Sequence, residues 1–258
     1  MRRLIDALAT QPADLVMLQE VYAGSGVPER MREQFATKLG LVGWHFGGRF
    51  TIGKKYGNVI ASRYPVRVVK RRPRPDAPWP QLLAHATVET PIGDVEAVSV
   101  HMPNGAANGW KKIETFDALG ALIATDDHRP RIVGGDFNEP DTVGPNNEII
   151  SCMADLDGIV RGHWRDSHGR RFPGSRWQSA VEGVLGPRSI LRHTWLARNQ
   201  GRFETTHITR GTKRFFDHLL VSRDHFDVVD SGFHHEWRRR GRRLSDHSAA
   251  WAVVRRLR

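Results

Sequence analysis

The segment RIVGGDFNEP, residues 131–140, places two polar side chains directly after a short apolar run. Ile132 and Val133 are typical of a buried strand, and the glycines that follow allow a tight turn and close approach of other groups. Asp136 and Asn138 are two residues apart, so at a strand end their side chains point the same way. A carboxylate there can hold a water for in-line attack, and a carboxamide can donate to a phosphoryl oxygen that gains charge. The same residue types also favour plain turns, so this segment alone does not decide its role.

Four other apolar segments contain polar residues that a strand does not need. They are LVMLQEV, EAVSVHMPN, RFFDHLLVS and RLSDHSAAW. Most of these polar residues, taken singly, have a plain structural explanation, such as a solvated strand end, a hydrogen-bonded core histidine or a capped turn. Asp217 is harder to explain in this way, because a buried carboxylate needs a partner. The residues in question are Glu20, His101, Asn104, Asp217, Asp246 and His247.

Taken together, these acids, amides and histidines are the components of a metal-assisted hydrolase. Hard oxygen ligands suit Mg²⁺, with Mn²⁺ as the alternative. The single cysteine, Cys152, excludes an internal disulfide and a cysteine-based zinc site. A histidine beside a buried aspartate would be a fixed and more basic imidazole.

Hydrophobic spacing predicts the elements that must position these residues. Helices are expected at Arg2–Thr10, Pro28–Leu39 and Ile113–Ile123. Strands are expected at 13–21, 57–62, 81–89, 95–101, 131–133, 215–221, 226–233 and 249–254. Residues 161–192 are rich in glycine, arginine and tryptophan and are expected to be mostly loop. Because nothing marks a boundary or a repeat, the pattern predicts one layered α+β domain over 1–258.

The composition indicates a globular protein without a membrane span. The chain has 258 residues, of which 39% are hydrophobic, enough to bury a core. Residues 1–10 contain two arginines but no long apolar stretch, and no apolar run is long enough to cross a bilayer. The absence of a signal peptide in this sequence predicts a cytoplasmic location, with a signal peptide upstream of a misassigned start as the alternative.

A net charge of +11 favours binding to a polyanion such as nucleic acid or anionic lipid. Arginine greatly outnumbers lysine, which biased codon usage explains equally well. Two basic segments, 70–75 and 237–247, flank the polar motifs; arginine forks bind phosphates, and Trp237 can stack on a base. A solvated loop is the alternative. The expected substrate-binding arginines are Arg238, Arg239, Arg240, Arg242 and Arg243.

The ordered set of motifs resembles the endonuclease/exonuclease/phosphatase superfamily, which includes deoxyribonuclease I, exonuclease III and the neutral sphingomyelinases. No single motif is specific, but their order along nearly the whole chain is. The matching pieces are LQE at 18–20, GNVIASRYP at 57–65, VHMPN at 100–104, GGDFN at 134–138, FDHLLVS at 216–222 and SDH at 245–247. The resemblance implies an α+β fold, a four-layer α/β/β/α sandwich of two packed mixed sheets with the site at one edge.

The resemblance also implies a role for each matching residue. Glu20 corresponds to the principal divalent-metal ligand, and Asp246 helps to hold metal or water. By the same comparison, Asp136 orients or activates the attacking water and Asn138 stabilises the phosphoryl transition state.

The remaining roles concern the phosphate. By resemblance, Asp217 orients His247, which contacts the scissile phosphate or acts as an acid–base. His101 occupies a position where other members place a histidine or tyrosine facing the phosphate, and Asn104 of the same motif is expected to bind substrate. The implied cofactor is Mg²⁺, with Mn²⁺ as the alternative.

The start of the chain departs from the family pattern. Members begin with a strand ending in an asparagine, whereas Met1 here leads directly into the first expected helix. A missing strand would leave a neighbouring strand unpaired. We therefore expect that the true start lies upstream, with a truncated chain as the alternative.

The expected substrate is a phosphodiester of nucleic acid. His101 in place of a tyrosine leans away from the exonuclease III type, and RFFDHLL lacks the Trp-Cys-Asp-Arg block of the inositol polyphosphate phosphatases. One alternative is a phospholipid or small-molecule phosphodiesterase or phosphatase of the same superfamily. Another is a non-catalytic polyanion-binding protein, if the missing strand is real. Trp164, Trp177 and Trp195 would serve a lipid or base surface, or pack the core, and no obligate protein partner is indicated.

Overall fold

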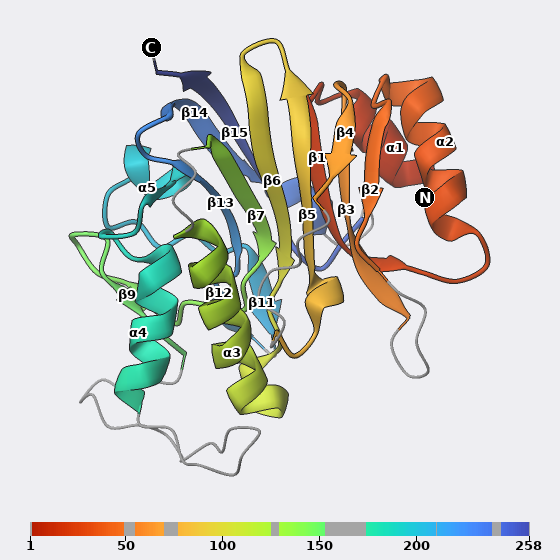
Figure 1. Ribbon diagram of the computed structural model, residues 1–258. Helices are drawn as coiled ribbons and strands as arrows, with labels where there is room; N and C mark the ends of the chain where they lie inside the picture. Colours follow the sequence, from red (N-terminus) through yellow and green to blue (C-terminus); the bar gives the residue numbers. More distant parts are fainter. Residues whose placement is uncertain are drawn as a thin grey trace. The chain divides into compact units, whose positions relative to one another are not determined.

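The computed structural model describes residues 2–48, 55–69, 77–124, 129–152, 174–209, 211–238 and 244–257 (Figure 1). Contacts divide the chain into two compact units, and each is described by itself. The first unit comprises Met1–Arg72, Pro80–His101 and Arg129–Gly135. The second comprises Pro73–Trp79, Met102–His128 and Asp136–Arg258. The expectation of a single domain stays a prediction.

In the part that the structure describes, the first unit combines a pair of α-helices with two groups of strands (Figure 1). Its helices are α1 (Arg2–Ala9) and α2 (Val27–Leu39). An antiparallel sheet of order β1-β3-β2 consists of β1 (Leu15–Tyr22), β2 (Gly43–Phe46) and β3 (Tyr56–Ser62). The second group, neighbours in the order β7-β6-β5-β4, consists of β4 (Val66–Val68), β5 (Leu83–Thr90), β6 (Gly93–His101) and β7 (Arg131–Asp136). A short 3₁₀ helix, η1 (Pro80–Leu82), precedes β5.

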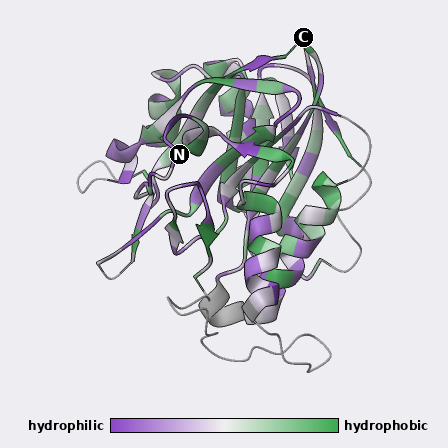
Figure 2. Cartoon of the chain, turned by 90° about the vertical axis from the view of Figure 1, so that its left-hand side faces the viewer, coloured by the Kyte–Doolittle hydropathy of each residue, from purple (hydrophilic) through white to green (hydrophobic). Residues whose placement is uncertain are grey.

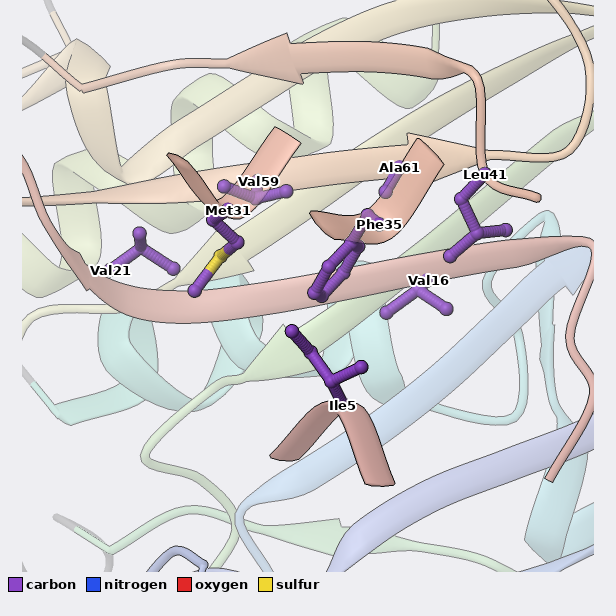
Figure 3. Packing of buried hydrophobic residues seen from close by; sticks show 8 residues of the cluster. All are labelled: Ile5, Val16, Val21, Met31, Phe35, Leu41, Val59 and Ala61. Carbon is purple, nitrogen blue, oxygen red and sulfur yellow. The ribbon is translucent and has the colours of Figure 1, made fainter. Parts of the chain in front are cut away.

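The two helices cover one face of the β1-β3-β2 sheet through a shared apolar cluster (Figure 3). Its buried members are Ile5, Val16, Val21, Met31, Phe35, Leu41, Val59 and Ala61. Because side chains alternate across a strand, Val59 and Ala61 face the helices while Ile60 faces the other way. Ile60 packs against a second cluster from β5 and β6, formed by Ala84, Ala86, Val88 and Ala97. The first unit therefore has three layers, helices on a sheet on a second sheet.

Among its described residues, the second unit contains three α-helices and four antiparallel strand pairs. The helices are α3 (Gly105–Ile123), α4 (Gly174–Leu185) and α5 (Thr194–Arg198). The pairs are β8 (Thr142–Val143) with β9 (Ile149–Ile150), β10 (Leu191–His193) with β13 (Asp217–Ser222), β11 (His207–Thr209) with β12 (Thr212–Arg214), and β14 (Phe226–His234) with β15 (Ala249–Arg256). The 3₁₀ helix η2 (His235–Arg238) follows β14. In the described part of the chain, no helix is both long and apolar enough to span a membrane.

Helix α4 corrects the expectation that residues 161–192 are mostly loop. The part at 161–173 lies outside the described residues, but 174–185 is helical and packs against α3. Trp177, Val181 and Val184 are buried and lie three or four residues apart, which is the spacing of one helix face. Figure 2 shows hydrophobic and hydrophilic residues in short bands along the helices. The glycines and arginines of this segment obscured that periodicity in the sequence.

The other expected elements are largely confirmed. The helix expected at Ile113–Ile123 begins earlier, at Gly105, with a break at Gly109 where φ is 26° and ψ is −101°. The sequence GAANG at its start has no apolar periodicity, so spacing could not show the first turns. The longer strands are present with ends shifted by at most a few residues. Strands of two to four residues, such as β2 and β8, are too short for an alternation to stand out.

Candidate active site

The segment at the end of β7 holds its two polar side chains together. Asn138 has φ of 51°, a left-handed conformation that asparagine adopts more readily than most residues. Its backbone N–H donates to Asp136 Oδ1 at 2.8 Å, and its side-chain Nδ2 donates to the Met102 carbonyl at 2.9 Å and to Asp136 Oδ2 at 3.3 Å. Phe137 between them is fully buried and donates its N–H to the Phe216 carbonyl at 2.8 Å. The buried Phe137 thus anchors the segment in the core, and the hydrogen bonds between Asp136 and Asn138 hold these two residues side by side.

His247 is paired with Asp217. Its Nδ1 lies 3.0 Å and 2.9 Å from the two carboxylate oxygens of Asp217, the first residue of β13, which is 8% exposed. Thr206, fully buried, links the two segments that carry this pair. Its Oγ1 accepts from the Asp217 N–H at 3.1 Å, and its carbonyl accepts from the Ser248 N–H at 2.8 Å. The pairing expected from the resemblance is therefore present in the structure.

Asp136 joins this pair. Ligand atoms of Asp136, Asp217 and His247 all lie within 4.8 Å of one another. Burial and the neighbouring Asp217 carboxylate raise the pKa of Asp136 to about 7, against opposing effects of His247, the Asn138 N–H and Lys112. The carboxyl group thus exchanges a proton near neutral pH.

The pKa of His247 is shifted in the direction that keeps it charged. Burial alone would lower it, but the hydrogen bond and negative charge of Asp217, with smaller effects of Asp136 and Asp246, raise the pKa of His247 to about 9. Near neutral pH the group therefore combines an imidazolium with a carboxyl that can act as a base. Such an arrangement is suited to acid–base chemistry on one substrate.

Asp246 and an unexpected histidine lie next to His247. The Asp246 side chain is exposed, and its backbone carbonyl lies 3.3 Å from His207 Nδ1. The His207 ring in β11 stacks on that of His247, with centroids 4.2 Å apart and planes at 28°. Ligand atoms of these three residues also lie within 4.8 Å of one another, but nearly parallel rings aim their lone pairs poorly at one ion. Nothing in the local sequence TTHIT distinguishes His207; only the bridge that pairs it with His247 brings it here.

Glu20 and His101 lie together in the first unit. His101 Nε2 is 3.7 Å from Glu20 Oε1, and the Glu20 side chain is 68% exposed. Glu20 has φ of 56°, and the β1–β3 register shifts between Leu18 and Val21. A bulge re-aims a side chain, and a non-glycine residue in this conformation is often found at a functional site. The structure therefore presents the Glu20 carboxylate outward at an irregularity in its strand.

Some of the expected substrate-binding residues and tryptophans lie within the described ranges, and others lie outside them. Asn104 is exposed directly before α3, and Arg238 is half-buried at the end of η2. Trp237 stacks on His234 with centroids 5.5 Å apart, so one face of its ring is already covered. Trp177 is buried, as in the core-packing alternative. The expected residues outside the described ranges are Arg239, Arg240, Arg242, Arg243, Trp164 and the basic segment 70–75.

Each unit contains oxygen donors of the kind that a hard divalent cation prefers. Glu20 offers an exposed carboxylate in the first unit, and Asp136, Asp217 and Asp246 offer carboxylates in the second. Carboxylate oxygens are the ligands that Mg²⁺ and Mn²⁺ prefer. Burial and the nearby Glu139 carboxylate raise the pKa of the Cys152 thiol, which removes it as a thiolate ligand for a softer metal.

Comparison with known proteins places the chain in a family. The sequence description of the Endonuclease/Exonuclease/phosphatase family matches residues 1–247, and the chain belongs to this family. The family comprises phosphoester hydrolases and is generally dependent on divalent metal ions. No curated protein matches the chain.

Solved structures show the fold. An endonuclease/exonuclease/phosphatase from Beutenbergia cavernae DSM 12333 is 21% identical with a TM-score of 0.58; the match covers 98% of this chain and 65% of that one, so this chain spans less than two thirds of its length. An AP endonuclease from Archaeoglobus fulgidus is 17% identical with a TM-score of 0.65, covering 97% of this chain and 92% of that one. A humanized D. rerio TDP2 is 14% identical with a TM-score of 0.59, covering 98% and 90%. The expected α+β fold of the deoxyribonuclease I-like superfamily is confirmed.

Proposed function

We propose that this protein is a divalent-metal-dependent phosphodiesterase whose substrate is nucleic acid. The observation that carries the proposal is the group formed by Asp136, Asp217 and His247, in which a carboxyl titrating near pH 7 lies beside a charged imidazole. Membership of the phosphoesterase family supports the reaction class. The net charge of +11 supports a polyanionic substrate.

Each residue of this group has its own proposed role in phosphodiester hydrolysis. Asp136 accepts a proton from the attacking water, for which a pKa near the working pH is well matched. His247, held by Asp217, donates a hydrogen bond or a proton to the phosphate or the leaving oxygen. Asn138 is fixed beside Asp136 by its hydrogen bond to Met102, and it stabilises the charge that develops on the phosphoryl group.

We propose Glu20, in the first unit, and Asp246, in the second, each as a ligand for a divalent cation. Both side chains are exposed and carry hard oxygen donors. When bound, Mg²⁺ or Mn²⁺ supplies positive charge that offsets the charge of the phosphate in the transition state. His101, 3.7 Å from Glu20, is proposed to face the phosphate.

The substrate is tested by presenting three phosphodiesters to the purified protein with Mg²⁺. Plasmid DNA, an aryl phosphodiester and phospholipid vesicles are each compared with and without a chelator, using Asp136→Ala as the inactive control. Cleavage of DNA and the aryl ester, lost in Asp136→Ala, supports the proposal. Cleavage of the aryl ester or the lipid without DNA would move the substrate to small or lipid phosphoesters. A folded protein that cleaves none of them would contradict the proposed activity.

A further inference from the structure

We infer that the buried Lys112–Glu139 pair is a positioning device that fixes the conformation of the Asp136–Asn138 segment. Lys112 lies in α3 and Glu139 directly follows the segment. Neither residue is proposed to touch substrate; each acts through the backbone that carries Asp136 and Asn138. The catalytic part of this inference rests on the proposed phosphodiesterase activity, whereas the structural part does not.

Lys112 reaches the segment through two contacts. Lys112 is only 1% exposed, and its Nζ donates to the Asn138 carbonyl at 2.5 Å and lies 2.7 Å from Glu139 Oε1. The Asn138 carbonyl belongs to the residue whose φ is 51°. The Lys112 ammonium group thus holds the peptide group between Asn138 and Glu139. The left-handed conformation of Asn138 has an intrinsic energetic cost for any residue with a Cβ.

Glu139 is fully enclosed by donors. It has no exposed surface, and its Oε1 accepts from Trp177 Nε1 at 2.9 Å as well as facing Lys112. Its Oε2 accepts from the Cys152 N–H at 2.7 Å. A buried carboxylate whose two oxygens both accept hydrogen bonds is held in a single position. Removing the positive charge of its partner leaves an uncompensated ion in the core.

A chain of two histidines holds the backbone of Glu139 as well. The His193 Nδ1 accepts from the Leu196 N–H at 3.3 Å, which leaves the proton of this neutral ring on Nε2. That nitrogen lies 2.6 Å from His218 Nδ1, which must then accept, so His218 Nε2 donates to the Glu139 carbonyl at 2.7 Å. Burial lowers the pKa of both histidines, in agreement with neutral rings. Side chain and main chain of Glu139 are therefore both anchored, one residue after Asn138.

The first unit provides a matched control for a purely structural effect. Glu96 and Arg131 also form a buried pair, with Glu96 Oε2 2.6 Å from Arg131 Nε. Arg131 stands at the start of β7, whereas Lys112 and Glu139 contact the segment after its end. Loss of one partner from either pair leaves a buried charge, but only disruption of the Lys112–Glu139 pair releases the segment that carries Asn138.

The kinetic test compares Lys112→Met with Glu96→Gln on an aryl phosphodiester with Mg²⁺. Lys112→Met is expected to lower kcat by about tenfold or more with little change in KM, because small misplacements of reacting groups have effects of this size. Glu96→Gln is expected to lower the melting temperature while keeping kcat within about twofold, since stability loss alone leaves folded enzyme intact. In an Asn138→Ala background the further effect of Lys112→Met should shrink, because residues that act as one unit are not additive.

A second readout is independent of activity. Hydrogen–deuterium exchange of peptides covering 136–140 should be faster in Lys112→Met than in the wild type, and unchanged there in Glu96→Gln. If Lys112→Met does not fold, the doubly neutral Lys112→Met/Glu139→Gln takes its place with the same expectations. Unchanged exchange at 136–140 overturns the inference, as does an undiminished kcat or an equal loss in the Asn138→Ala background. An inactive wild type would contradict the proposed function instead, and exchange alone would then decide this inference.

Discussion

At the scale of single residues, one buried environment shifts two ionisable groups upward for different reasons. The pKa of Asp136 is raised mainly by burial, because the charged carboxylate loses its hydration. The neighbouring negative charge of Asp217 raises it further. For His247, burial works in the opposite direction and is outweighed by Asp217, whose carboxylate accepts its hydrogen bond. The result is a base that is partly protonated and an acid that is charged at the same pH.

The His247 pKa should therefore depend on Asp217. In Asp217→Asn the pKa of His247 is expected to fall well below about 9, because burial is then opposed only by the smaller effects of Asp136 and Asp246. NMR titration of the His247 ring measures this directly. A His247 pKa that stays near 9 in the variant would show that Asp217 is not its cause.

The same pair sets a pH dependence of stability. A folded pKa of about 9 lies above the unfolded value of 6.5, so the contribution to stability is fully present below pH 6.5 and is lost as the pH rises through 9. The free energy of unfolding, measured with urea between pH 6 and pH 10, should decline over this window for the wild type and less for Asp217→Asn. Equal slopes for the two proteins would contradict the assignment.

Glu96 predicts the opposite pH dependence in the first unit. Burial alone would raise its pKa, but interactions with His85 and Arg131 outweigh this and lower the pKa of Glu96 to about 2. A depressed folded pKa contributes stability above the ordinary value of 4.5 that is lost as the pH falls towards 2. Urea unfolding from pH 5 to pH 2.5 should show a steeper loss for the wild type than for Glu96→Gln. Parallel curves would contradict the prediction.

At the scale of elements, the sequence predicts what depends on local pattern. Long helices and strands such as α2 and β6 repeat their apolar residues often enough to be recognised. The acids of the site were recognisable because each interrupts or ends such a pattern, as at Glu20 and Asp217. His207, Lys112 and Glu139 were not, because their partners lie tens of residues away and only the folded chain brings them together.

Glycine substitutions test how tightly β7 is built. Gly135 has φ of +143°, and a Cβ there would lie 1.9 Å from the Val100 carbonyl oxygen and 2.9 Å from Gln19 Nε2. Gly135→Ala is therefore expected to lower the free energy of unfolding by more than about 2 kcal/mol, through strain and overlap with backbone.

Gly120 provides the control for this experiment. It lies inside α3, where an added Cβ meets no described atom within 4 Å. Gly120→Ala should raise the free energy of unfolding by about 0.5–1 kcal/mol, because alanine favours the helix more than glycine does. Urea unfolding of both variants measures whether each substitution raises or lowers the free energy of unfolding. A harmless Gly135→Ala would mean that β7 can shift away from β6.

At the scale of the whole molecule, the family indicates the reaction class, whereas the net charge bears on the substrate. Membership of the Endonuclease/Exonuclease/phosphatase family indicates phosphoester hydrolysis as the reaction class, but one fold can serve several substrates. The net charge of +11 is the property that favours a polyanion over a small ester.

Salt dependence tests this use of charge. Binding of DNA to an inactive Asp136→Asn variant should weaken tenfold or more between about 50 and 200 mM salt, because bound counterions are released from the phosphates. The KM for an aryl phosphodiester should change much less over the same range. Fluorescence anisotropy with labelled DNA measures the first quantity. DNA affinity that is indifferent to salt would contradict electrostatic recognition.

The Mg²⁺-dependent kcat on an aryl phosphodiester, compared between the wild type and Asp136→Asn, tests directly whether Asp136 takes part in the hydrolysis. Glu96→Gln serves as a matched variant away from the site. We predict hydrolysis by the wild type and Glu96→Gln, none with chelator, and a loss of about 100-fold or more in Asp136→Asn, as expected when a general base is removed. Equal activity of Asp136→Asn and the wild type would contradict the account, since it would place the chemistry elsewhere.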